Sequence, residues 1–312
     1  MKANAGITEI LRSITDLSCD RHHFISDFLT NAGLSPIPVT IGQARFILLR
    51  FDNKLYSPKL GPVKVLAAHH DSAPGSPGAN DNAAAVVQLM LASPRLAGAT
   101  RPHNTIMLFT DKEEADLSGS PKTQGSFMLG EFFRSQGMKD LVFMNLDMTG
   151  RGDTVVISEA AELFLASRNK SNTELYKKLH NLRELLLTRI PQTVRGRFLS
   201  LRTPFSDNLG FLLQGFPAIH LTLLPFHEAS LYKKQMDTLK DDLAQTGNSS
   251  GNKINGVPAA SVFRARFAAI QPETWRLRHG QADTVDSLDM ASFPLMEEVI
   301  QVISKLDMAG NR

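Results

Sequence analysis

The chain has 312 residues, of which 42% are hydrophobic and 21% are charged. This length suits one large α/β domain or two smaller domains. Glycine and proline occur 21 and 16 times, close to their ordinary frequency, which argues against collagen-like and disordered chains. The formal net charge is only +3 and the basic residues are spread along the chain, so we expect no nucleic-acid partner.

Cysteine usage and the N-terminal segment bear on the cellular compartment. The single cysteine, Cys19, cannot form a disulfide within the chain. Residues 1–18 lack the apolar segment of a signal peptide, and no stretch approaches the ~20 apolar residues of a membrane-spanning helix. We therefore expect a cytoplasmic protein that does not bind membranes. The sequence sets no oligomeric state.

Short apolar runs alternate with helical patterns along the chain. The apolar runs predict strands, and the segments between them predict helices. The predicted strands are 45–51, 63–68, 105–110, 141–146 and 218–224, and the predicted helices are 83–92, 126–135, 171–187, 207–213, 228–243 and 290–306. This alternation predicts one α/β domain over 1–312, with a mostly parallel mixed central sheet flanked by helices on both faces.

One segment, at about 225–278, interrupts the alternation. Here a charged helical stretch leads into 246–253, a tract rich in Gly, Asn and Ser that predicts a surface loop. No second β/α pattern follows, so we interpret the segment as an excursion within the domain. We expect it to pass near the rim of a site and to influence substrate selection through apolar contacts. Its aromatic residues are Phe226, Tyr232, Phe263, Phe267 and Trp275.

Polar residues follow the predicted strand 63–68 at the point where it ends. His69 and Asp71 are two positions apart, so in an extended chain their side chains point the same way. Open α/β sheets bind ligands at the carboxyl ends of their strands. A histidine beside a carboxylate suits a metal ligand whose ring is held by a hydrogen bond. Taken alone, however, a histidine at a strand end is more often an ordinary core or surface residue.

Carboxylates also follow the next two predicted strands. Glu113 and Glu114 come after 105–110, and Asp147 comes after 141–146. Asp81 directly precedes a helix, where an N-cap role would be the ordinary explanation. Carboxylates gathered at one edge repel each other unless a cation compensates them. The pattern therefore points to a metal site.

These motifs, in this order, resemble those of the M28 family of zinc aminopeptidases. The resemblance covers roughly residues 63–285. Its motifs are His69-x-Asp71, Gly78-Ala-Asn-Asp81, Glu113-Glu114, Asn145-x-Asp147-Met-x-Gly150, Ser206-Asp207-Asn, and His279-x-x-x-Asp283-Thr. Five or more matches in the right order make the resemblance specific.

The resemblance implies two zinc ions and assigns their ligands. Asp81 would bridge both ions, His69 and Asp147 would complete one site, and Glu114 and His279 would complete the other. Each zinc then has one imidazole and open positions for water and substrate.

The resemblance also implies roles for two further carboxylates. Glu113 would be the general base that takes a proton from the attacking water. Asp71 would orient His69. A cis peptide between Asp81 and Asn82 is a further expectation from the resemblance.

Three functions remain open at this point. The first is an aminopeptidase acting on peptides with a free N-terminus. The second is a glutaminyl cyclase, because the long connection after Glu114 resembles those enzymes, which use one zinc to cyclise an N-terminal Gln. The third is a non-catalytic interaction module on the same fold, which is disfavoured because such modules typically lose metal ligands and every ligand position is filled here.

Overall fold

The computed structural model describes residues 2–309 apart from 115–119, 247–252, 255–256 and 259–264. Its centre is an eight-stranded mixed sheet with the strand order β1-β2-β4-β3-β5-β8-β6-β7. The strands are β1 (Ile37–Ile41), β2 (Ala44–Leu49), β3 (Val63–His69), β4 (Thr105–Thr110), β5 (Leu141–Leu146), β6 (Thr154–Ser158), β7 (Arg197–Leu201) and β8 (Ala218–Leu224). The predicted fold class is thereby confirmed.

The middle of the sheet is parallel, and an antiparallel pair borders it on each side. Strand β3 pairs in parallel with β4 and with β5, and β5 pairs in parallel with β8. Strand β2 pairs with β4 in the antiparallel sense, and β6 does the same with β8. As a result, the carboxyl ends of β4, β3, β5 and β8 lie at the same edge of the sheet.

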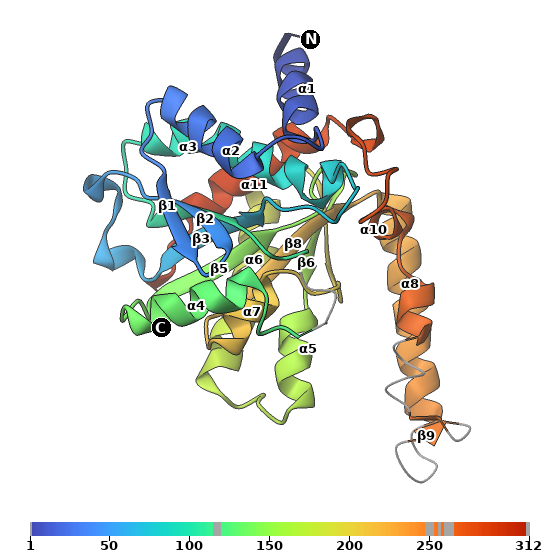
Figure 1. Ribbon diagram of the computed structural model, residues 1–312. Coiled ribbons are helices and arrows are strands. Elements are labelled where there is room, and N and C mark those ends of the chain that lie inside the picture. The colour runs from blue at the N-terminus through green and yellow to red at the C-terminus, as the bar shows by residue number, and fades with distance from the viewer. Residues whose placement is uncertain (1, 115–119, 247–252, 255–256, 259–264, 310–312) are drawn as a thin grey trace.

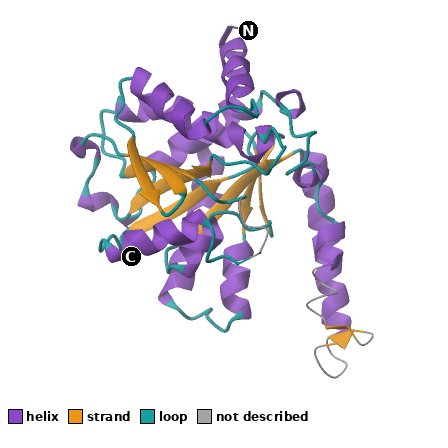
Figure 2. Cartoon of the chain, viewed as in Figure 1, coloured by secondary structure: helices purple, strands orange, loops and turns teal. Residues whose placement is uncertain are grey.

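Helices cover both faces of the sheet (Figures 1 and 2). One face carries α1 (Lys2–Ile14), α2 (Arg21–Asn31), α3 (Ala84–Ala97), α6 (Glu174–Thr193) and α11 (Ser292–Lys305). The other carries α4 (Gly125–Ser135) and α7 (Asn208–Leu213), with α5 (Ala160–Ser167) in contact with α6 and α7. Helices must cover both faces because the central strands β3, β4, β5 and β8 are buried along almost their whole length.

Strand β3 shows how the sequence divides between the two faces. Val65 and Ala67 belong to the core beneath α4 and α7, whereas Leu66 and Ala68 belong to the core on the opposite face. Side chains alternate along a strand, so a continuous apolar run supplies both cores at once. Strand β3 ends at His69, which lies at the edge of the sheet.

Several elements were absent from the sequence prediction. All five predicted strands and all six predicted helices are present, with ends shifted by a few residues. The missed strands β1, β6 and β7 are only five residues long, and β1 is a partly exposed edge strand. The missed helices include α1 and α2, which lie before the region 63–285 that the motifs cover, and α5, which has only eight residues.

The excursion at about 225–278 begins with the long helix α8 (Phe226–Thr246), which extends away from the sheet in Figure 1. It also contains the short pair β9 (Lys253–Ile254) and β10 (Val257–Pro258) and the helix α10 (Glu273–Arg276). Most of the tract predicted to be a surface loop, and Phe263, lie outside the described residues.

The aromatic residues of this excursion mostly serve packing, which corrects their expected role in contacting substrate. Tyr232 and Trp275 are fully buried and their rings meet edge to face, 5.1 Å apart. Together with Met236 they form a third, smaller core against Leu201. Of the aromatic residues in the described part, Phe226 stays exposed and lies under the guanidinium of Arg197.

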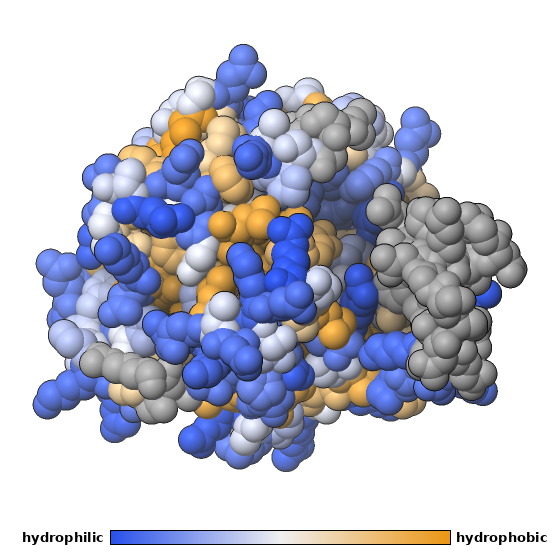
Figure 3. Space-filling model, turned by 90° about the horizontal axis from the view of Figure 1, so that it is seen from below, coloured by the Kyte–Doolittle hydropathy of each residue, from blue (hydrophilic) through white to orange (hydrophobic). Residues whose placement is uncertain are grey.

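The surface mixes polar and apolar residues. The face seen from below in Figure 3 is mostly hydrophilic, with a smaller apolar area near its centre. Among the described helices, none is long and apolar enough to cross a membrane.

Candidate metal centre

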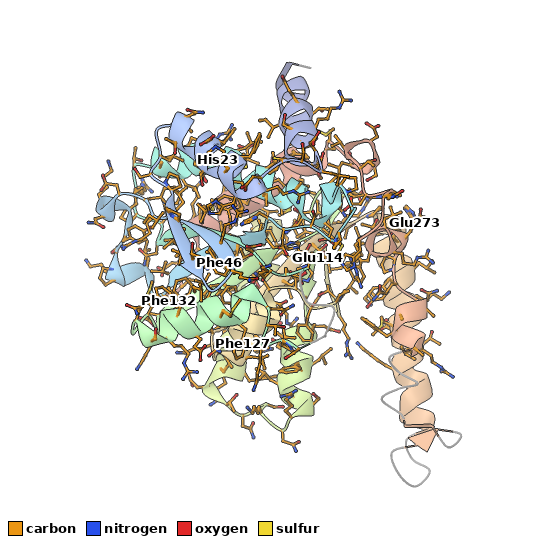
Figure 4. The ribbon with its side chains drawn as sticks, viewed as in Figure 1. His23, Phe46, Glu114, Phe127, Phe132 and Glu273 are labelled. Atoms are coloured by element: carbon orange, nitrogen blue, oxygen red, sulfur yellow. The ribbon has the colours of Figure 1, made fainter. Side chains whose placement is uncertain are left out.

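The sheet places the predicted ligands beside one another. His69, the last residue of β3, pairs with Thr110, the last residue of β4, so the residues that follow β4 emerge next to it. Strand β5 flanks β3 on the other side and is followed directly by Asp147. Glu114 lies close to these strand ends in Figure 4.

The first candidate metal group comprises His69, Asp81 and Asp147. Their ligand atoms all lie within 4.8 Å of one another. His69 Nε2 is 3.2 Å from Asp81 Oδ1 and 3.7 Å from Asp147 Oδ1. All three residues are buried.

The second candidate group comprises Asp81, Glu114 and His279, again within 4.8 Å. His279 Nε2 is 2.9 Å from Glu114 Oε2 and 3.5 Å from Asp81 Oδ2. The His279 side chain is 49% exposed, in contrast to 1% for His69. One half of the centre is therefore enclosed and the other faces solvent. Asp81 belongs to both halves, with one carboxylate oxygen toward each histidine.

Glu113 and Asp71 border these groups. A carboxylate oxygen of Glu113 lies within 4.8 Å of ligand atoms of His69 and Glu114. The Asp71 carboxylate lies 3.4 Å from His69 Nδ1 and accepts hydrogen bonds from the backbone N–H groups of Glu113 (3.3 Å) and Glu114 (2.9 Å). Asp71 thus contacts the ring of one predicted ligand and the backbone of another.

The turn Ala79–Ala83 presents Asp81 to both groups. The Asp81–Asn82 peptide is cis, as the resemblance led us to expect. The Asn82 side chain donates to Leu146 O at 2.9 Å, and Asn80 Oδ1 accepts from Gly150 N at 2.8 Å. These amides therefore join the turn to the segment that carries Asp147.

Asp283 holds the same turn from the other side. Its carboxylate accepts from the backbone N–H groups of Asn80 (2.7 Å) and Asp81 (3.0 Å), and its own carbonyl accepts from Ala79 N at 3.1 Å. Because Asp283 lies four residues after His279, it couples the shared carboxylate to the segment that carries the exposed histidine.

The acidic groups perturb one another strongly. Burial and the neighbouring Asp147 raise the pKa of Asp81 to about 7. Burial also acts to raise the pKa of Asp147, but its favourable contacts, those with His69 first among them, together outweigh burial and lower the pKa to about 2. Burial acts to lower the pKa of His69, yet its contacts with Asp147, Asp71 and Asp81 hold that pKa well above the usual range. Burial raises the pKa of Glu113 well above its usual range.

The residues present fit a divalent metal. Imidazole nitrogens and carboxylate oxygens are the donors that zinc prefers when no cysteine is available. His69 Nε2 and Asp147 Oδ1 are buried and make no hydrogen bond to any described residue. Buried polar atoms without partners are costly, and a metal ion between them would satisfy both.

Sequence reasoning assigned no role to several residues that shape the site. Asn80 and Asp283 lie inside the quoted motifs and Asn82 directly follows one of them, so the motifs were the signal that could have found all three. Asp207 is a further case: it is buried, accepts a hydrogen bond from Thr110 Oγ1, and has its pKa raised to about 6 by burial.

The chain is similar to known proteins in sequence and in fold. The sequence profile of peptidase family M28 matches residues 57–303, most of the chain. The chain belongs to peptidase family M28. Membership identifies an M28 metallo-exopeptidase, implies a bound metal with zinc as the expected ion, and points to peptides as substrates. No curated protein matches the sequence of this M28 chain.

Solved structures with the same fold include both aminopeptidases and cyclases. The LapA aminopeptidase of Legionella pneumophila is 15% identical, with a TM-score of 0.60 over 98% of this chain and 72% of that one. A leucine aminopeptidase precursor of Bacteroides thetaiotaomicron is 16% identical, with a TM-score of 0.57 over 97% and 96%. The glutaminyl cyclase of Porphyromonas gingivalis is 14% identical, with a TM-score of 0.57 over 96% and 97%. At these identities the likeness establishes the fold, and this M28 fold is common to both activities.

Proposed function

We propose that this M28 chain is a two-zinc aminopeptidase that removes the N-terminal residue of peptides. The observation that carries the proposal is the position of Asp81. Its Oδ1 lies 3.2 Å from His69 Nε2, and its Oδ2 lies 3.5 Å from His279 Nε2. One carboxylate is therefore shared between two complete donor groups, as a pair of bridged metals requires.

Each half of the centre has its own ligands in this proposal. His69, Asp81 and Asp147 would hold one zinc, and Asp81, Glu114 and His279 would hold the other. Bound zinc supplies Lewis acidity, which polarises a peptide carbonyl and lowers the pKa of water. The exposed side of His279 leaves room for substrate to enter, whereas the His69 side is closed by protein.

Glu113 is the proposed general base. Its carboxylate lies close to ligand atoms of His69 and Glu114, but Glu113 belongs to neither of the two groups that contain Asp81. A carboxyl with a raised pKa can take the proton of the attacking water and return it to the leaving amine. Asp71 supports the step because its carboxylate lies against the His69 ring and accepts hydrogen bonds from the backbone N–H groups of Glu113 and Glu114.

Glutaminyl cyclase activity is the second candidate. It is supported by the fold shared with the cyclase of Porphyromonas gingivalis over nearly the whole of both chains. In that reaction the α-amine of an N-terminal Gln attacks its own side-chain amide and expels ammonia. The enclosed group around His69 favours the aminopeptidase, because a one-zinc cyclase has no need of a second complete donor group.

The two reactions give different products from one substrate panel. The zinc-loaded protein is incubated in H₂¹⁸O with peptides that begin with Leu, Ala or Gln, and the products are analysed by mass spectrometry. We expect free N-terminal amino acids that carry one ¹⁸O. Pyroglutamyl peptide plus ammonia from the Gln peptide, without cleavage of the others, would contradict the proposal and establish the cyclase.

A further inference from the structure

Arg21, the first residue of α2, is a buried cation with an unusual set of partners. Only 9% of its surface is exposed. Its guanidinium donates to three backbone carbonyls: Nε to Ile14 O at 3.0 Å, Nη1 to His70 O at 3.2 Å and Nη2 to Pro77 O at 2.5 Å. Within the described part of the chain, no carboxylate forms an ion pair with it. A buried arginine is more often neutralised by a direct acidic partner.

Two of these carbonyls belong to the segment that carries the proposed ligands. His70 lies between His69 and Asp71, and Pro77 lies four residues before Asp81. Arg21 therefore spans the two ends of the loop 70–77 and fixes the separation between them. Its guanidinium is close against this loop, because a Cβ added at Gly78 would lie 3.2 Å from Nη2.

Charge explains why a cation is tolerated at this buried position. Asp71, Asp283 and Asp81 all attract the guanidinium through space, which offsets part of the cost of removing it from water. The fork of the guanidinium also supplies three directed N–H groups at fixed angles, which a lysine ammonium cannot reproduce.

The two helices on either side of this contact are anchored in the core. Helices α1 and α2 bury Leu11, Ile14, Ile25 and Leu29 completely in the core. The third carbonyl partner, Ile14 O, is the end of α1, so Arg21 also closes the connection between the two helices. These helices precede the region 57–303 that the family profile matches.

We propose that Arg21 is a positioning residue of the metal centre, through which the N-terminal helices α1 and α2 set the spacing of His69, Asp71 and Asp81. The inference rests on the proposed metal site. Supporting groups behind metal ligands typically change metal affinity or activity by about 10- to 100-fold when they are replaced.

The test compares Arg21→Lys and Arg21→Gln with Ile25→Ala in the full chain. Ile25→Ala is the matched control, because it removes a fully buried apolar side chain from the same helix and leaves in place the Arg21 side chain that binds His70 O and Pro77 O. Zinc affinity is measured by competition with a chromogenic chelator, the unfolding temperature is measured on the metal-free proteins, and kcat and KM are measured on an aminoacyl amide.

We expect both Arg21 variants to bind zinc at least tenfold more weakly and to lose kcat more than they raise KM, with Arg21→Gln affected more than Arg21→Lys. Ile25→Ala should lower the unfolding temperature at least as much yet keep zinc affinity within threefold of the parent. Arg21 variants with parental zinc affinity, or an equal loss in Ile25→Ala, would overturn the role of Arg21. A parent that binds no zinc at all would instead overturn the proposed function on which the role depends.

Discussion

At the scale of single residues, Glu113 carries the proton transfer in the proposed reaction. Glu113→Gln keeps the shape of the side chain but removes its ability to accept a proton. We expect turnover to fall by about 10² to 10⁴-fold, the usual contribution of a positioned general base. Zinc content and unfolding temperature should match those of the parent and of Glu131→Gln, an exposed control on α4. Turnover within a few-fold of the parent would assign the base to another residue.

A substitution at Asp81 should affect metal binding and not only turnover, because Asp81 belongs to both donor groups. In Asp81→Asn the bridging charge is lost, while the hydrogen bonds that Asp283 accepts from the turn's backbone remain available. We expect the variant to lose both metals together, as measured by elemental analysis of the dialysed protein. Retention of one full equivalent of zinc would show that the two groups do not share this carboxylate.

At the scale of elements, the start of α4 constrains the connection that carries Glu113 and Glu114. A Cβ on Gly125 would lie 1.8 Å from Asp111 O, an impossible contact, and Gly125 N donates to Lys112 O at 3.2 Å. Gly125→Ala must therefore displace backbone beside Glu113, and overpacking of this kind costs about 1–3 kcal/mol of stability.

Gly98→Ala is the control for this substitution, because its Cβ would meet ordinary contacts of 3.5 Å or more. We expect Gly125→Ala to lower kcat at least tenfold and to weaken zinc binding, and Gly98→Ala to change neither. Equal kinetics in both variants would mean that this connection does not position the carboxylates.

How far the sequence predicts the molecule also depends on the kind of element. Strands such as β3 and β5 were predictable because they are buried on both faces and read as continuous apolar runs. The five-residue strands β6 and β7 are too short to stand out in this way, and α1 and α2 lie outside every motif.

In the candidate site, the ligands were predictable from the sequence, whereas the contacts that hold them in place were not. Its predicted ligands follow strand ends and lie in recognisable motifs, so the structure finds them close together. The contacts of Asp283 with Asn80 and Asp81 join residues more than 200 positions apart. Arg21 likewise binds backbone carbonyls, which no side-chain pattern reveals. Both depend on tertiary proximity and could not be predicted from one sequence.

At the scale of the whole molecule, Lys64 connects the central strand β3 to the C-terminal segment. It is fully buried, and its Nζ donates to Leu306 O at 2.5 Å. Burial lowers its pKa from 10.5 to about 8, with Asp307 acting weakly in the opposite direction. The folded state therefore releases this proton at lower pH than the unfolded state.

The sign of the pH effect follows from this difference. Below pH 8 both states are protonated and the burial penalty is fully present, whereas between pH 8 and 10.5 the unfolded state binds more protons and stability rises with pH. We expect the unfolding free energy of the parent, measured against Lys64→Met in denaturant titrations with chelator, to increase by roughly 3 kcal/mol across this window, at 1.36 kcal/mol per pKa unit. If the difference in unfolding free energy between the parent and Lys64→Met does not change with pH, Lys64 has an ordinary pKa in the folded protein.

The most direct test of the central claim is an anomalous difference map at the zinc edge from crystals of the zinc-loaded protein. The proposal predicts two peaks about 3.5–4 Å apart, the separation usual for two-metal sites. Asp81 should lie between them, with His69 and Asp147 at one peak and Glu114 and His279 at the other. A single peak at full zinc occupancy, or two peaks held by other residues, would contradict the account.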